Sequence, residues 1–275
     1  MIQFQNEHMT VFQSVLYQTT SAVVQTADLV LVVDPNWLPS EIEQIRSYVD
    51  QIQGGRELYL LFTHGDFDHI IGYRAFPDAK VIGSKGLNEH PQKAYKLELI
   101  RDFDAKHYVE RKYPIEFPEP DIIVSDNEQQ LKVGATTLTF YRAPGHTADG
   151  LFTCVEPLGI LVAGDYLSDF ELPFIYDSAK AYQQTLLTAK RIFEQYAIKA
   201  LVPGHGRVAT DPDEMRRRLH LAEDHLNRLI QAVTESDEAA VAALGQEHAF
   251  PSSFTQECHA ENVRIIRQEF GKQNG

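Results

Sequence analysis

The sequence contains little cysteine and little basic charge. Its two cysteines, Cys154 and Cys258, lie far apart, and neither belongs to a C-x-x-C pair. A disulfide framework or a thiolate zinc site is therefore not indicated. Lys and Arg number 25 against 39 Asp and Glu, which gives a formal net charge of −14. This balance disfavours a surface adapted to nucleic acid, although a net charge leaves room for a local basic groove.

Membrane and export signals are also missing. No window reaches the roughly 18 apolar residues of a membrane span, and residues 1–7 lack a basic region followed by an apolar core. These absences predict a cytoplasmic protein without a membrane partner. A length of 275 residues with 43% hydrophobic content predicts a large domain with a well-buried core, with or without an appendage.

One stretch, Thr-His-Gly-Asp-Phe-Asp-His at residues 63–69, stands out for its chemistry. It follows the apolar run 58–62, which predicts a buried strand. Four potential metal ligands thus lie at the exit of a core strand. They are His64, Asp66, Asp68 and His69. Imidazole and carboxylate groups are ligand types that Zn²⁺ and its transition-metal neighbours accept. A polar loop that happens to hold two histidines is the alternative interpretation.

Three later apolar strands also end beside a potential ligand. The strand and residue pairs are 137–141 with His146, 158–164 with Asp165, and 198–204 with His205. His146 follows a Pro-Gly turn, which allows the backbone to bend sharply. Because loops from several strands converge at one edge of a layered α/β fold, we expect these side chains to lie near the first motif.

The remaining patterns predict layers of strands and helices. Residues 9–34 are typical of a strand meander, and Ser40 with Glu43 has the spacing of a capping box for a helix ending near Ile52. A second amphipathic helix is predicted over 182–196, and a short strand over 80–83. Residues 84–120 are charged and rich in Tyr, which we interpret as a helical insertion over the site.

Residues 211–275 show only helical patterns, so we expect a domain over 1–210 and a helical appendage after it. The predicted helices begin near Asp211, cover 238–244 and run over 259–270. Arg216, Arg217 and Arg218 point in different directions on a helix, which favours solvated side chains over a phosphate site. His90 and His107 are isolated and are interpreted as surface residues.

The order H-x-D-x-D-H, Gly-His-Thr, Gly-Asp and Gly-His resembles that of the metallo-β-lactamase superfamily of hydrolases. The resemblance covers residues 1 to about 210. It implies a four-layer αββα sandwich with a dinuclear metal site at one edge. The implied ligands are His64, Asp66 and His146 for the first metal, Asp68, His69 and His205 for the second, and Asp165 as the bridge.

The sequence departs from the family pattern at Asp66, where most relatives have a second histidine. This substitution is similar to the nuclease-like domains of DNA-uptake channel proteins, and an acidic residue there is similar to the diiron flavoprotein branch. A third carboxylate would lower the formal charge of the centre from about +1 to about zero when a bridging hydroxide is counted. We therefore expect two divalent ions, with zinc favoured and manganese or iron as alternatives at the site containing Asp66.

In the implied mechanism, a metal-bound hydroxide attacks the substrate, and Asp68 and Asp165 hold the catalytic ions. Asp34, at the end of a strand, is a candidate partner of a ligand, with structural capping as its alternative. Thr63 and Thr147 are expected to orient their neighbours. Tyr166 and Tyr176 are candidate donors to a substrate oxyanion, although packing roles are favoured for them.

The leading functional hypothesis is a hydrolase acting on a small ester, lactone or thioester. A phosphodiesterase is the alternative, a diiron redox module ranks third, and a non-catalytic scaffold ranks last. We expect a small-molecule substrate and no nucleic-acid partner. The oligomeric state is left open, with a homodimer as one option.

Overall fold

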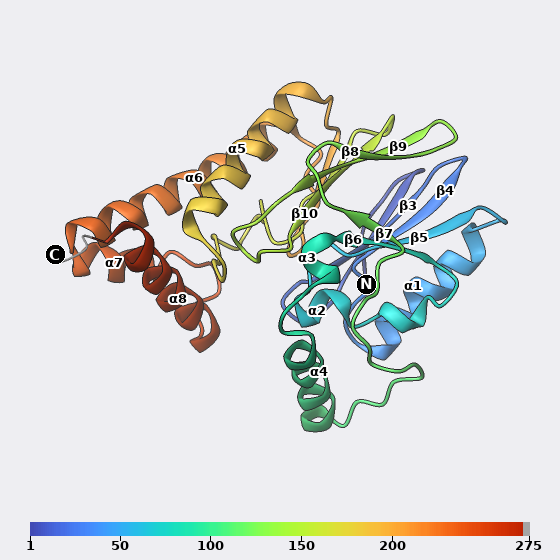
Figure 1. The fold of residues 1–275 in the computed structure, drawn as a ribbon, viewed down its shortest axis with the longest axis horizontal. Helices are drawn as coiled ribbons and strands as arrows, with labels where there is room; N and C mark the ends of the chain where they lie inside the picture. Colours follow the sequence, from blue (N-terminus) through green and yellow to red (C-terminus); the bar gives the residue numbers. More distant parts are fainter. Residues whose placement is uncertain (272–275) are drawn as a thin grey trace.

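The computed structural model describes residues 1–271, which form two sheets with helices on their outer faces (Figure 1). Seven strands form the first sheet, in sequence order from edge to edge. They are β1 Ile2–Gln5, β2 Met9–Gln13, β3 Thr20–Gln25, β4 Leu29–Val33, β5 Glu57–Leu61, β6 Lys80–Ser84 and β7 Ile122–Val124. Strands β1 to β4 pair antiparallel, as expected for a meander. Strands β4 to β7 pair parallel, because helical segments connect them.

Five strands form the second sheet, in the order β12-β11-β10-β9-β8. They are β8 Gln129–Val133, β9 Thr136–Arg142, β10 Leu151–Glu156, β11 Ile160–Val162 and β12 Ala200–Val202. The β11–β12 pair is parallel and the other pairs are antiparallel. Strands β1 and β10 were not predicted from the sequence.

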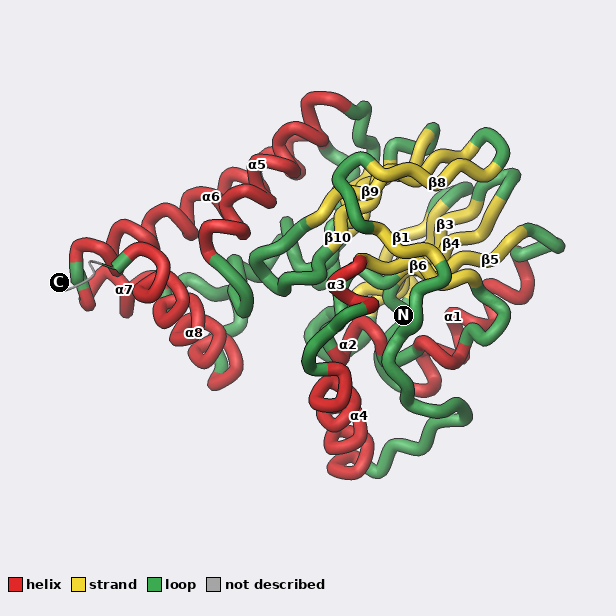
Figure 2. Tube along the Cα trace, in the orientation of Figure 1, coloured by secondary structure: helices red, strands yellow, loops and turns green. Residues whose placement is uncertain are grey.

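Three apolar clusters hold the layers together. Leu31 and Leu61 of the first sheet share one cluster with Phe140 and Val162 of the second, so the two sheets pack face to face. Helices cover both outer faces (Figure 2). Helix α1, Pro39–Ile52, packs on the first sheet, and helix α5, Ala179–Gln195, packs on the second. The layer order is therefore αββα, as the family resemblance implied.

Helix α1 begins differently from its prediction. Pro39 is its first residue, and the Glu41 side chain, not that of Glu43, accepts a hydrogen bond from the backbone of Leu38 at 2.9 Å. Proline is favoured at the first position because its missing N–H has no intrahelical partner there. The Ser40 and Glu43 capping box was therefore wrong, although the helix ends at Ile52 as expected.

The insertion after β6 is helical only in its first half. It contains α3 Lys85–Asn88 and α4 Lys93–His107, and the following residues, 108–121, form no helix or strand. Helix α4 is fixed to the domain, since Phe103 packs on Trp37 with ring centroids 4.6 Å apart. Arg111 donates to the carboxylate of Asp104 and to the carbonyl of Trp37.

Three helices follow the last strand and extend the molecule away from the first sheet (Figure 1). They are α6 Pro212–Glu235, α7 Glu238–Leu244 and α8 Ser253–Phe270. Asp211 caps α6 as predicted, whereas α8 starts six residues earlier than predicted, after a Ser252 cap. These helices share one apolar cluster with α5 and the second sheet.

Arg218 departs from the interpretation of the three arginines on α6 as solvated. Arg216 and Arg217 are exposed, but Arg218 is buried and donates to the carbonyl of Arg207 at 2.7 Å. It also pairs with Glu214, so it ties α6 to the segment after β12.

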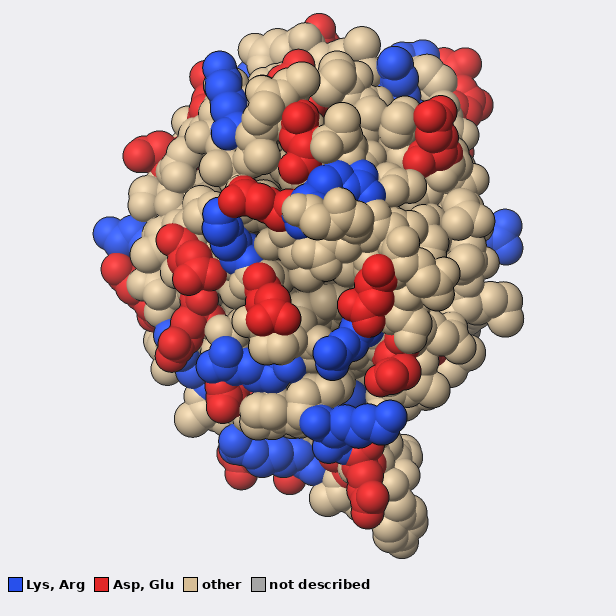
Figure 3. All heavy atoms as spheres, turned by 90° about the vertical axis from the view of Figure 1, so that its right-hand side faces the viewer, with Lys and Arg blue, Asp and Glu red and all other residues tan. Residues whose placement is uncertain are grey.

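None of the helices within residues 1–271 is long and apolar enough to cross a bilayer. On the face in Figure 3, seen from the right of Figure 1, basic and acidic side chains are intermingled. That face carries no continuous surface of one charge.

Candidate metal centre

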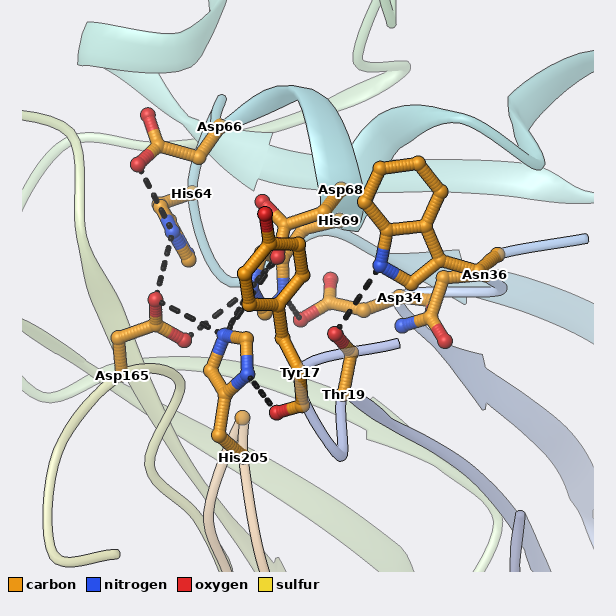
Figure 4. Close-up of polar contacts among 12 residues, drawn as sticks. Tyr17, Thr19, Asp34, Asn36, His64, Asp66, Asp68, His69, Asp165 and His205 are labelled. Atoms are coloured by element: carbon orange, nitrogen blue, oxygen red, sulfur yellow. Dashed lines mark hydrogen bonds and ion pairs between the residues drawn. The ribbon is translucent and has the colours of Figure 1, made fainter. Parts of the chain in front are cut away.

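The candidate ligands come from the ends of strands in both sheets. His64, Asp66, Asp68 and His69 follow β5, and the short helix α2, Phe67–Ile70, begins inside this motif. His146 follows β9, Asp165 follows β11, and His205 follows β12. The structure brings all seven side chains together at one edge of the sandwich. Figure 4 labels all of them except His146.

The first group of ligands contains His64, Asp66 and His146. The Oδ2 atom of Asp66 lies 3.8 Å from Nε2 of His64 and 3.5 Å from Nε2 of His146. The three ligand atoms lie within 4.8 Å of one another. This spacing suits a single ion placed between them.

The second group contains Asp68, His69 and His205. Oδ2 of Asp68 lies 3.6 Å from Nε2 of His69 and 3.5 Å from Nε2 of His205. The two histidine Nε2 atoms are 3.4 Å apart. At this separation one ion would be within reach of both nitrogens.

Asp165 lies between the two groups. Its Oδ1 is 3.1 Å from Nε2 of His69, and its Oδ2 is 3.2 Å from Nε2 of His146 and 3.4 Å from Nε2 of His205. Each group therefore has one oxygen of Asp165 within reach, which is the position that a bridging carboxylate requires.

Each histidine is oriented by a partner at its other ring nitrogen. The Nδ1 atoms of His146 and His205 lie 2.8 Å from the carbonyl oxygens of Phe174 and Tyr17, respectively. A carbonyl only accepts, so both Nδ1 atoms carry a proton and both Nε2 atoms face the centre.

Asp34 and Thr63 orient the remaining two histidines. Asp34 Oδ2 lies 3.0 Å from Nδ1 of His69 and 2.5 Å from the hydroxyl of Thr63. The Thr63 hydroxyl, 3.0 Å from Nδ1 of His64, accepts from that nitrogen and donates to Asp34. Asp34 thus serves as a buried acceptor behind two ligands, which is the arrangement found around metal-binding histidines.

The polar atoms that face the centre fit a metal ion. Nε2 of His64, Nε2 of His146 and Oδ1 of Asp165 are buried and have no hydrogen-bond partner among residues 1–271. A buried polar atom without a partner costs roughly 1–3 kcal/mol. Three of them converging on one space indicate that a cation completes the site, and the imidazole and carboxylate donors suit zinc and similar divalent ions.

The charges of the centre also favour a cation. Burial alone would raise the pKa of Asp165, but the surrounding histidines, led by His69, hold it well below its usual range. Burial alone would likewise raise the pKa of Asp66, and His146, His64 and Lys96 lower it. Both carboxylates are therefore ionised and ready to bind at neutral pH.

A glycine allows the close approach that the centre needs. A Cβ atom on Gly204 would lie 2.1 Å from Oδ1 of Asp165 and 3.0 Å from the ring of His69. The first distance is far inside van der Waals contact, so only glycine fits between β12 and the ligands. The Pro-Gly turn before His146 also needs its glycine, because Gly145 has a φ of +126°.

Three other candidates do not face the ligands as substrate donors. The Tyr166 hydroxyl is buried and donates to the carbonyl of Pro144 at 2.9 Å, so it supports the turn before His146. The Tyr176 hydroxyl lies 3.0 Å from Sγ of Cys258, while its ring packs on His146. The Thr147 hydroxyl makes no hydrogen bond to any residue that the structure describes.

Several residues near the ligands were not identified from the sequence. Lys96 of α4 lies 2.5 Å from Asp66, and Glu171 lies 3.8 Å from Nδ1 of His205. Burial raises the pKa of Glu171 to about 7. Lys96 reaches the site from α4 and Glu171 from the segment after Asp165, and no local motif marks either residue. His107 is exposed as expected, whereas His90 is half-buried beside the ligand loop at Gly65.

A pocket of about 260 Å³ opens beside His205. Tyr17 and Glu171 line it and also contact this histidine. Three segments line it, and they contribute the four phenylalanines Phe170, Phe174, Phe250 and Phe254. A larger pocket of about 440 Å³ lies between α5 and α6, and none of the seven ligands lines it.

Comparison with known proteins identifies the family. The family model described as the metallo-beta-lactamase superfamily matches residues 15–205. The metallo-beta-lactamase type 2 of Bacillus sp. (strain 170) is 26% identical over 189 residues, which cover 68% of this chain and 66% of that relative. The matched residues include all seven ligands and exclude α6 to α8.

Solved structures share the fold at low sequence identity. The stereoselective inverting sec-alkylsulfatase Pisa1 from Pseudomonas sp. has a TM-score of 0.71 at 12% identity, over 99% of this chain and 50% of its own. A metallo-beta-lactamase family protein from Thermus thermophilus has a TM-score of 0.66 at 17% identity, over 96% of this chain and 94% of its own.

The metallo-beta-lactamase from Pontibacter korlensis has a TM-score of 0.56 at 17% identity, over 81% of this chain and 98% of its own. This chain thus spans about half the length of the alkylsulfatase and slightly less than two thirds of the curated relative. The family match over most of the chain, together with the αββα layers and the ligands at their edge, establishes that this protein belongs to the metallo-β-lactamase superfamily of metal-dependent hydrolases.

Proposed function

We propose that this protein hydrolyses a small ester, lactone or thioester at a centre of two divalent ions, with zinc as the favoured metal. The observation that carries the proposal is the convergence of seven ligands in two groups that share Asp165. When bound, such ions supply Lewis acidity and lower the pKa of a water ligand, so no serine or cysteine nucleophile is required.

The residues of the chain provide the orientation that this chemistry needs. The four histidines are held through Nδ1, so their Nε2 atoms are directed toward the centre, where they would hold divalent ions. Asp66 and Asp68 each add an oxygen to one group. The four histidines are buried, which limits their contact with water.

The aromatic pocket supports a substrate with an apolar substituent. It adjoins His205, so a substrate whose reacting group lies at the ions would place a neighbouring substituent between Tyr17, Phe174 and Phe254. Burying an aromatic or branched alkyl group there would contribute roughly 2 kcal/mol to binding. A simple acetate ester lacks such a group and would not gain this binding energy.

The second candidate is a phosphate or sulfate ester. The fold of an alkylsulfatase matches 99% of this chain, including the helices after β12, whereas the Pontibacter enzyme covers 81%. A phosphodiesterase is also consistent with Asp66, although the net charge of −14 works against an anionic substrate.

Metal analysis of the purified protein and a chromogenic panel test the proposal. The panel contains carboxylic esters, lactones, a thioester, phosphodiesters and a sulfate ester, each with a small and an aromatic substituent. We expect two zinc equivalents and fastest turnover of an aromatic carboxylic ester or lactone. If the metal-loaded protein hydrolyses only the phosphate or sulfate compounds, the first candidate function is wrong and the second is supported.

A further inference from the structure

The unusual ligand Asp66 has a basic partner from the insertion. Nζ of Lys96 lies 2.5 Å from Oδ1 of Asp66, and their side chains are only 16% and 13% exposed. Ion pairs on open surface contribute little because water screens them, but this pair is largely buried beside the ligands. The pair is therefore part of the site.

The two oxygens of Asp66 have different partners. Oδ1 accepts from Lys96, whereas Oδ2 faces Nε2 of His64 and Nε2 of His146. One oxygen is thus occupied by the ammonium group, and one remains for an ion. Asp66 is arranged to bind through a single atom, as an imidazole does.

Helix α4 holds Lys96 in this position. Ile100, one turn later, is fully buried, and Phe103 packs on Trp37. The helix also contacts α2, the short helix that contains Asp68 and His69. Lys96 therefore reaches Asp66 from a fixed backbone, and little ordering is required for the pair to form.

Lys96 changes the charge expected for the centre. The sequence alone suggested that a third carboxylate would make the centre less positive by about one unit than in relatives with histidine at this position. The ammonium group supplies about one positive charge at the same carboxylate. The summed charge returns to that of a site with two carboxylates and five neutral histidines.

We propose that Asp66 and Lys96 act as one unit that replaces a neutral histidine ligand, with Lys96 as the positioning residue. Lys96 fixes Asp66 for binding through Oδ2 and cancels its extra charge. The inference rests on the proposed two-metal centre and adds a residue that the ligand motif does not contain. It also predicts that Asp66→His alone, with Lys96 still present, weakens zinc binding.

A double-mutant cycle on zinc binding tests the proposal. Metal-free wild type, Asp66→His, Lys96→Met and the double variant are titrated with zinc against a competing chromogenic chelator, and bound zinc is counted by elemental analysis. In Asp66→His the lysine is left without its carboxylate partner beside the first ligand group. We therefore expect the zinc affinity of that group to fall about tenfold or more. Adding Lys96→Met should restore it to within about threefold of wild type.

Two controls separate charge from packing. Lys96→Arg keeps the positive charge and should bind zinc more like wild type than Lys96→Met does. Lys93→Met removes a charge one turn earlier on α4, where Lys93 lies over the ring of Phe117, and should leave zinc binding unchanged in both backgrounds. Circular dichroism of each variant confirms that α4 remains folded.

The possible outcomes are distinct. If Asp66→His binds two zincs as tightly as wild type, or if Lys96→Met has the same effect in both backgrounds, the pair is a structural contact and the inference is wrong. If wild type binds no zinc or other divalent ion, the proposed function fails together with the inference.

Discussion

Asp165 touches both ligand groups, and its replacement is the most direct test of the shared centre. Asp165→Ala removes one oxygen from each group at once, so we expect bound metal and turnover to be lost while the fold survives. Elemental analysis, turnover and circular dichroism measure these effects, with Asp50→Ala on the exposed side of α1 as the matched control. Full turnover by a folded Asp165→Ala protein would contradict a two-metal mechanism.

Gly204 gives a second prediction for a single residue. The Cβ atom introduced by Gly204→Ala would overlap Oδ1 of Asp165, so the carboxylate or the β12 backbone must move. We expect metal affinity to fall at least about tenfold and stability to fall by roughly 1–3 kcal/mol from overpacking. Chelator competition and thermal unfolding measure the two effects. A Gly204→Ala variant with unchanged zinc affinity would show that the close approach is not needed.

The convergence of the seven candidate ligands was predictable because each lies in a segment that follows an apolar strand. The ends of strands can be identified in a sequence, and the order of motifs in the superfamily then assigns the residues to two ligand groups. Lys96 and Tyr17 carry no such mark, since they reach the centre through tertiary packing of α4 and of the loop before β3. The role of Tyr166 was also not predictable, because its nearness to Asp165 in sequence says nothing about where its hydroxyl points.

At the scale of elements, the start of α8 closes the aromatic pocket. Phe254 of α8 packs on Tyr17 and Phe174, with ring centroids 5.3 and 5.9 Å apart. Phe254→Ala should therefore raise KM for aromatic esters about tenfold or more, with little change for acetate esters. Steady-state kinetics on matched esters measure this, with Leu187→Ala on the exposed face of α5 as the control. An equal rise in KM for both esters would show that the aromatic substituent does not bind in this pocket.

The elements themselves were predictable where a clear period or turn residue marked them. Helix α6 shows a Pro after an Asp cap, and its start was confirmed at Pro212. Strand β10 was missed because its sequence, Leu-Phe-Thr-Cys-Val-Glu, lacks the alternation of a half-buried strand. The reason is that five of its six residues are buried, between one sheet and one helical layer.

At the scale of the whole molecule, the segment after β12 contains histidines that link folding to pH. Burial lowers the pKa of His225 to about 4, and burial also lowers the pKa values of His248 and His259. Glu247, which also pairs with Arg228, lies 3.5 Å from His225. Its carboxylate raises the pKa of His225, but the lowering by burial is larger. The unfolded chain binds these protons near pH 6.5, so the folded state loses stability as pH falls from 6.5 toward 4.

For His225 alone, we expect the free energy of unfolding to fall by roughly 2 kcal/mol between pH 7 and pH 5. Urea unfolding of metal-free protein at both pH values measures the change. His225→Gln removes the titrating group and should make the fall smaller by a similar amount. An identical pH dependence in the variant would show that other groups control acid stability.

We propose that residues 211–275, of which the structure describes 211–271, belong to a helical appendage that depends on the domain before it. Leu219, Leu226 and Leu229 of α6 share a cluster with Leu186 of α5 and Phe152 of β10. A chain ending at residue 210 would expose this cluster, so we expect it to aggregate, while the full chain unfolds in one calorimetric transition. Limited proteolysis that releases a stable fragment ending near residue 210 would contradict this expectation.

The division of the ligands between two sheets has a mechanical consequence. His64 and Asp68 follow a strand of the first sheet, whereas His146 and His205 follow strands of the second. Ions at the centre would cross-link the open edge of the sandwich and close chain loops as long as 64–205, much as a reversible disulfide does. The two sheets could then separate at that edge only after an ion leaves. The lifetime of the folded chain should therefore follow the supply of free metal.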